Sequence, residues 1–145
     1  MKKTISLFLI FFLFVTATVS ADYADTKRYL LSQVPDPTVS SVGGEWTVIG
    51  LAKSGDPELS DYFSRYTQNV QSVLSEKNGV LHERKYTEYA RVVLALTAIG
   101  QDPQNIGGYN LLLPLADYDK TVFQGVNGAI WALFAFDSGN YEIPA

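Results

Sequence analysis

Short apolar segments that end at a glycine recur along this chain at nearly regular intervals. Segments 50–57 and 96–103 both run from small apolar residues through a glycine to Asp-Pro, and segment 132–139 is a looser third copy. The stop glycines are Gly55, Gly100 and Gly139. A spacing of roughly 40 to 50 residues with two helices per unit is typical of stacked helical hairpins. The sequence therefore predicts an all-α fold built from helical-hairpin repeats.

Each repeat is expected to contain one short helix that is apolar on every side. The segments 45–54, 88–99 and 128–136 have almost no polar face. Helices of this kind are buried on all sides when the protein folds. The three segments are therefore predicted to form an inner layer.

The remaining helices are expected to cover this layer on the solvent side. The clearest of them opens at Asp56-Pro57, an N-cap acid followed by proline at the first helical position, and its apolar residues fall at spacings of three and four. We also expect a first helix over 22–34 and two short helices over 109–115 and 117–124.

The first twenty-one residues have the pattern of a secretory signal peptide. Lys2 and Lys3 precede an apolar run, and small residues then lead to Ala21, after which we expect cleavage. The alternative is a retained anchor, but the apolar run is about half of the roughly 20 residues that span a membrane. We therefore expect a signal peptide over 1–21, no membrane span after cleavage, and one domain over 22–145 that is secreted or displayed at the cell surface.

Charge and composition exclude several classes of function. Without Lys2 and Lys3, nine Lys and Arg remain against fifteen Asp and Glu, which gives a net charge of −6. Nucleic-acid binding needs clustered basic residues, so no nucleic-acid partner is expected. The chain has no cysteine and one histidine, which leaves no zinc site. No metal and no cofactor is predicted, and stability must come from a packed core.

Three segments carry a resemblance to a known family. Residues 43–55, 81–100 and 109–118 resemble the opening part of a domain of secreted and surface proteins of Gram-positive bacteria. That domain is related to the α/α toroids of terpenoid cyclases and prenyltransferases, and the resemblance extends over residues 23–145. It implies a partial toroid of about three helix pairs, roughly half of a complete ring. The chain is then a fragment, a truncated product, or half of a toroid that needs a partner or downstream domains.

The toroid resemblance also implies where a ligand would bind. In toroids, ligands occupy a funnel whose rim is made by the loops that lead into the inner helices, here 43–46, 82–89 and 124–128. Trp46 belongs to this rim, although its place in an apolar helix also fits a core residue, as does that of Trp131. The implied ligand-binding residues are Glu45, Trp46, Arg84, Lys85, Tyr86, Glu88, Gln124 and Asn127.

Two carboxylates leave a catalytic alternative open. Glu45 and Glu88 both stand at the first position of a predicted inner helix. They either act as acid and base with Tyr86 and Arg84, or they stabilise the helices because a negative charge is favoured at the N-terminal end of the helix macrodipole. The thiolates of protein prenyltransferases and thioester proteins are absent. The first hypothesis is therefore a non-enzymatic module that binds a cobalamin-like small molecule or a wall glycan. The alternatives are an extracellular carbohydrate-active lyase or hydrolase of the toroid class, and a structural spacer of a larger surface protein.

Overall fold

The computed structural model describes residues 22–144. The predicted signal peptide therefore lies outside the described residues. Within residues 22–144 the chain forms seven α-helices, three short 3₁₀ helices and no strand, apart from an isolated bridge between Ile106 and Tyr109. The prediction of an all-α fold is confirmed.

The helices follow the predicted order along the chain. The α-helices are α2 (Tyr23–Gln33), α3 (Glu45–Ala52), α4 (Ser60–Glu76), α5 (Thr87–Ala98), α6 (Leu113–Ala116), α7 (Tyr118–Thr121) and α8 (Val126–Asp137). The 3₁₀ helices are η1 (Ser41–Gly43), η2 (Pro57–Leu59) and η3 (Val122–Gln124). Each predicted helix therefore has a counterpart, and the break between the two short helices falls at Asp117.

Gly55 and Gly100 end helices and Asp56 starts one, as the sequence predicted. Gly55 and Gly100 have φ values of +66° and +74°, which glycine adopts readily at helix ends. The Asp56 carboxylate accepts a hydrogen bond from the backbone N–H of Glu58 at 3.0 Å and so caps η2. In the third copy the positive φ falls on Asn140 rather than on Gly139, which makes that copy looser in structure as well as in sequence.

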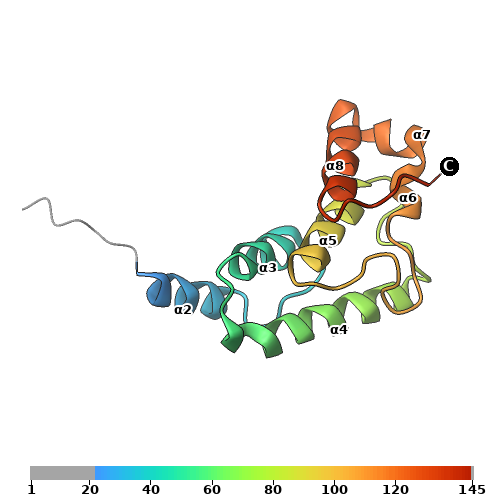
Figure 1. Cartoon of the computed structure of the whole chain (residues 1–145). Helices are drawn as coiled ribbons and strands as arrows, with labels where there is room; N and C mark the ends of the chain where they lie inside the picture. Colours follow the sequence, from blue (N-terminus) through green and yellow to red (C-terminus); the bar gives the residue numbers. More distant parts are fainter. Residues whose placement is uncertain (1–21, 145) are drawn as a thin grey trace, which may run out of the picture.

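Three helices form a row in which α3 packs against α5, and α5 packs against α8 (Figure 1). One groove is lined by a residue from the carboxyl end of each of these helices, namely Lys53 of α3, Thr97 of α5 and Ser138 of α8. The three helices therefore run in the same general direction. Figure 1 shows α4 passing below α3 and α5 as the base of the molecule.

The amphipathic helix α4 places its apolar side in the core, as predicted. Its buried side chains are Tyr62, Tyr66, Val70 and Leu74, all spaced by four residues. They join a single core with α5, in which Val92, Val93, Ala95 and Leu96 are fully buried. Each large apolar side chain that is fully buried contributes about 1.5–3 kcal/mol relative to exposure, so this layer is a main source of stability.

The prediction that every apolar helix is buried on all sides is wrong for α8. Only Gly128, Ala132, Ala135 and Phe136 are buried, whereas Leu133 and Phe134 are 54% and 53% exposed. Within the described residues, α8 packs mainly against α5, α7 and η3, and these neighbours leave its other side largely exposed. In α3, Trp46 is likewise 41% exposed.

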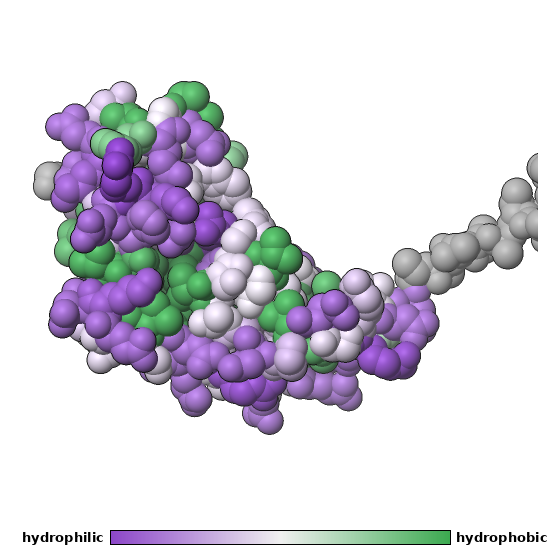
Figure 2. Space-filling model, turned by 180° about the vertical axis from the view of Figure 1, so that it is seen from behind, coloured by the Kyte–Doolittle hydropathy of each residue, from purple (hydrophilic) through white to green (hydrophobic). Residues whose placement is uncertain are grey.

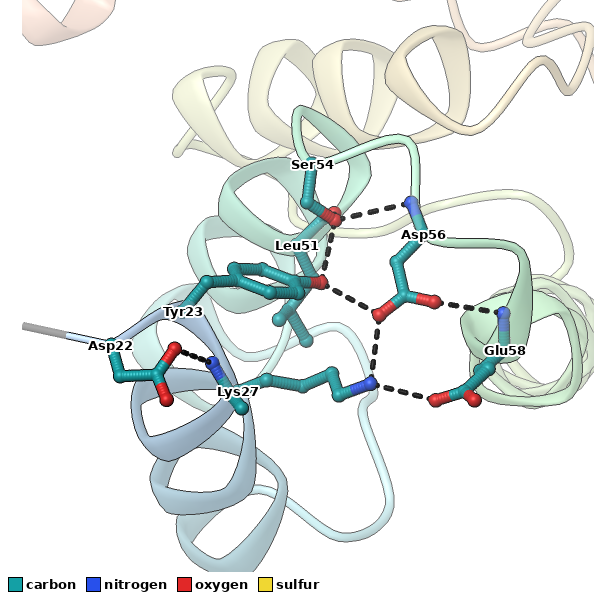
Figure 3. Close-up of polar contacts among 8 residues, drawn as sticks. Asp22, Tyr23, Lys27, Leu51, Ser54, Asp56 and Glu58 are labelled. Atoms are coloured by element: carbon teal, nitrogen blue, oxygen red, sulfur yellow. Dashed lines mark hydrogen bonds and ion pairs between the residues drawn. The ribbon is translucent and has the colours of Figure 1, made fainter.

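The first helix, α2, has no fully buried residue and is attached both by polar contacts and by Leu30 and Leu31, which are partly buried against the core. Lys27 donates hydrogen bonds to Asp56 and Glu58, both at 2.8 Å (Figure 3). The Tyr23 hydroxyl lies 2.9 Å from Asp56 Oδ2 and 2.7 Å from Ser54 Oγ. These contacts raise the pKa of Lys27 and lower the pKa of Asp56, so both groups stay charged.

Candidate functional site

Two of the three predicted rim segments lie side by side. The backbone N–H of Thr87 donates to Gln124 Oε1 at 3.1 Å. The Arg84 guanidinium lies 4.1 Å from the centroid of the Phe123 ring, within cation–π range. Residues at the start of α5 and just before α8 are therefore brought together, as the rim hypothesis requires, although nothing in the sequence singled out Phe123.

The predicted rim residues of this group differ in exposure. Arg84, Lys85 and Asn127 are exposed, and Glu88 is half-buried. Tyr86 is only 7% exposed and belongs to the core, where its ring stacks on Tyr89 at 5.4 Å between centroids. Tyr86 is therefore placed beneath the rim surface and not on it.

The expectation that Glu45 faces a ligand is wrong. Its side chain is fully buried in the first turn of α3, where Oε1 accepts a hydrogen bond from the Ser40 N–H at 3.2 Å. Oε2 lies 3.7 Å from Arg91 Nε, and burial raises the pKa of the Glu45 carboxyl, although Arg91 acts in the opposite sense. A side chain with no exposed surface cannot meet a substrate, so Glu45 does not serve as the acid or the base of the proposed pair.

The ion pair between Glu45 and Arg91 belongs to a small buried polar cluster that the sequence did not reveal. Glu45 Oε2, Arg91 Nε and the Tyr66 hydroxyl are buried without a hydrogen-bond partner among the described residues. Burial raises the pKa of Tyr66 well above its usual value, and the charge of Glu45 acts in the same sense. Tyr66 lies in the row of buried side chains spaced by four in α4, and Arg91 lies in a helix that was predicted to have almost no polar face. Neither residue therefore indicated a buried polar cluster.

The most distinctive exposed feature is a group of aromatic rings on one side of the helix row. The Trp46 and Trp131 rings meet edge to face, with centroids 5.5 Å apart and an interplanar angle of 62°. Phe134 adds a third ring at 5.8 Å from Trp131. The helices α3 and α8 thus present aromatic rings together. Trp131 is half-buried and does not lie wholly in the core, as its position in an apolar helix had suggested.

A groove of about 260 Å³ adjoins these rings. It is lined by Trp46, Ile49, Lys53, Leu94, Thr97, Ala98 and Ser138. We call this groove, together with Trp131 and Phe134, the aromatic face. Its polar edge is ordered, since Thr97 Oγ1 lies 2.9 Å from the Tyr141 hydroxyl and accepts a hydrogen bond from Ser138 at 3.4 Å. Seen from behind, Figure 2 shows hydrophobic residues at the surface in the bend between the arm that holds α8 and the base.

The aromatic face combines apolar ring surfaces with hydroxyl groups and one ammonium group. Ring surfaces bind the flat, apolar sides of other rings, and hydroxyl groups fix their orientation by hydrogen bonds. Among residues 22–144, no three His, Cys, Asp or Glu side chains are grouped in a way that would hold a metal ion. In the same part of the chain, every helix is too short or too polar to cross a bilayer.

Comparisons of the chain with protein-family models, with curated proteins and with solved structures gave no match.

Proposed function

We propose that this chain is an exported, non-enzymatic binding module of the α/α-toroid type that holds a wall glycan on its aromatic face. The proposal rests mainly on the placement of Trp46 and Trp131, the two tryptophans of the chain, in contact on a partly exposed surface. Two tryptophan rings in contact at the surface offer a flat apolar area on which a sugar ring can stack.

The arrangement of the helices supports the toroid part of the proposal. In an α/α toroid, inner helices stand side by side, run in the same direction, and are covered by outer helices. The row of α3, α5 and α8, with α4 beneath it, is compatible with a segment of such a ring. The sequence resemblance over residues 23–145 points to the same family of folds.

The size of the groove distinguishes between the two ligand classes. Pockets that enclose drug-sized molecules have about 300–1,000 Å³, and the groove has about 260 Å³. A molecule as large as a cobalamin does not fit inside it, whereas one ring of a longer chain does. A glycan, which offers one sugar ring after another, is therefore the better candidate.

Sedimentation with an insoluble wall glycan tests this proposal. Residues 22–145 should be depleted from solution by purified glycan, and Trp46→Ala should weaken binding by about 2 kcal/mol, roughly thirty-fold, as for other buried-on-binding tryptophans. Tyr29→Ala is the matched control, because Tyr29 is an exposed aromatic residue on α2 (63% exposed) outside the aromatic face. Equal loss in both variants, or no depletion of the unaltered protein, would refute the proposal and favour a structural spacer.

The enzyme alternative is tested with the same protein. The burial of Glu45 speaks against it, because a substrate cannot reach a side chain with no exposed surface. We expect no release of reducing ends or unsaturated sugars from polysaccharides. If such activity appears and is lost in Glu88→Gln, the protein is a carbohydrate-active enzyme and the proposal of a non-enzymatic module fails.

Export is the remaining part of the proposal, and it is supported by the sequence of residues 1–21. When the full chain is expressed in a Gram-positive host, the protein recovered outside the cell should begin at Asp22. Recovery of the intact chain from the membrane fraction would instead indicate a retained anchor.

A further inference from the structure

The outward side of α8 carries large apolar residues where a solvent-facing helix would carry polar ones. Val126, Ile130, Leu133 and Phe134 are 76%, 42%, 54% and 53% exposed. Their spacings of four, three and one place them on one face, opposite the buried Gly128, Ala132 and Ala135. We call these four residues the α8 ridge.

A groove of about 300 Å³ runs beside the α8 ridge. Leu115 of α6, Tyr118 of α7 and the C-terminal Ile143 form part of its wall, together with Ala129 and Ala132 of α8. Small residues such as alanine let another helix approach closely. The same side of the molecule therefore offers both a projecting row of side chains and a depression that can receive one.

The side chains that form the ridge and line the groove carry no charge, although the protein is acidic. Asp137, the last residue, is the only charged residue of α8, and the residues that line the groove include no Lys, Arg, Asp or Glu. The segment 22–145 has a net charge of −6, so charges are plentiful elsewhere. Depletion of charge marks the centre of protein–protein interfaces, and it also removes the repulsion between two copies of an acidic chain.

The extent of the surface approaches that of a specific interface. Tyr118 and Ile143 line the groove and are 70% and 61% exposed, so the apolar surface continues from the ridge across the groove. If each of these six side chains exposes on the order of 100 Å², one copy presents roughly 600 Å² of apolar surface. This lies at the upper end of the roughly 300–600 Å² of the largest patch on a typical monomer, and the half-buried Ala116 and Ala129 in the groove bring it towards the about 800 Å² per partner of a standard interface.

We propose that the α8 ridge and its groove form a two-fold interface with a second copy of this chain, in which each ridge enters the groove of the other copy. A two-fold interface uses the same patch twice, so the patch must contain both complementary halves. A ridge next to a groove satisfies that requirement. The inference does not rest on the proposed glycan binding. Phe134 belongs to both the α8 ridge and the aromatic face, but the groove beside α6 and α7 shares no lining residue with the groove beside Trp46.

Sedimentation velocity of residues 22–145 over a range of concentrations provides the first test. The protein should form dimers, and Ile130→Glu should raise the dissociation constant more than roughly ten-fold, because a desolvated carboxylate would lie in the interface. Val80→Glu is the matched control, since Val80 is a β-branched residue of equal exposure (43%) on the loop between α4 and α5. It should leave the dimer intact.

Disulfide cross-linking gives a second test that does not rely on destabilising the interface. The chain has no cysteine, so Leu133→Cys introduces a single thiol near the centre of the ridge. Under mild oxidation this variant should form covalent dimers at low concentration, and Val80→Cys should not. A monomer at every soluble concentration, or equal cross-linking of both variants, would overturn the proposal. A monomer would mean that this surface is covered by another protein or by further helices of a longer chain.

Discussion

Replacing Arg91 with leucine should destabilise the protein far more than the loss of an ordinary surface arginine. Glu45 is fully buried, and the Arg91 side chain, 18% exposed, is its only ion-pair partner among residues 22–144. At the observed separation of 3.7 Å and an effective dielectric constant of about 20, their attraction is about 4 kcal/mol. Breaking a buried pair by removing one member costs roughly 3–5 kcal/mol, in agreement with this value.

The loss should depend on pH in a defined direction. Burial raises the pKa of the Glu45 carboxyl, and removal of Arg91 takes away a group that lowers it. A carboxyl with a raised pKa in the folded state stabilises the protein fully below its unfolded pKa, and this contribution is lost as the pH rises through the folded value. Arg91→Leu should therefore be least stable near neutral pH and should recover as the solution is acidified.

Urea unfolding followed by tryptophan fluorescence measures both effects. With a slope of about 2 kcal/mol per molar urea, the midpoint of Arg91→Leu should fall by about 2 M at neutral pH. The double variant Glu45→Gln/Arg91→Leu should recover most of this loss, because no charge remains buried. Arg65→Leu is the control, since the Arg65 guanidinium lies over the Tyr62 ring and its loss should cost no more than about 1 kcal/mol. If the double variant is as unstable as Arg91→Leu alone, the reasoning is refuted.

Four further substitutions have expected outcomes. Gly50→Ala should stabilise the protein by about 0.5–1 kcal/mol in thermal or urea unfolding, because a Cβ there meets no atom within 4 Å and alanine favours the helix. Gly44→Ala should instead cost about 1–3 kcal/mol, because its Cβ would collide with a backbone carbonyl group across the loop; equal effects of the two changes would contradict this. Tyr62→Phe removes the 2.9 Å hydrogen bond from the partly buried Tyr62 hydroxyl to the Val34 carbonyl and should lower stability by about 1 kcal/mol, a value that urea unfolding can check. Asp56→Ala removes contacts with α2 and should speed hydrogen exchange in α2 while leaving α5 unchanged; equal protection of α2 in both proteins would show that the polar contacts do not hold it.

The helices were predictable because their signals are local. Asp56-Pro57 marks a helix start through capping chemistry within a few residues, and the spacing of four in α4 identifies its buried side. The burial of α8 was not predictable in the same way. Its composition shows that both sides are apolar, but only the arrangement of neighbouring helices determines that one side stays exposed.

The candidate site was predictable only in part. The rim hypothesis grouped Gln124 with the segment 82–89, and the hydrogen bond from the Thr87 N–H joins the two in the structure. It also named Trp46, but the Trp46 ring contacts Trp131, which lies outside the predicted rim. The burial of Glu45 was missed, because a glutamate in the first turn of a helix usually faces solvent and favours the helix dipole there. Its partner Arg91 comes from a different helix, and such pairing has no local signature.

The fluorescence of the aromatic face provides the most direct measurement of ligand binding at that face. Trp46 and Trp131 are the two tryptophans of the chain, so all tryptophan emission originates within the proposed site. Soluble fragments of wall glycan should change the emission in a saturable manner, and Trp46→Phe should reduce the change. If the glycan sediments with the protein while the emission stays constant, the ligand binds elsewhere and the aromatic face is not the binding site.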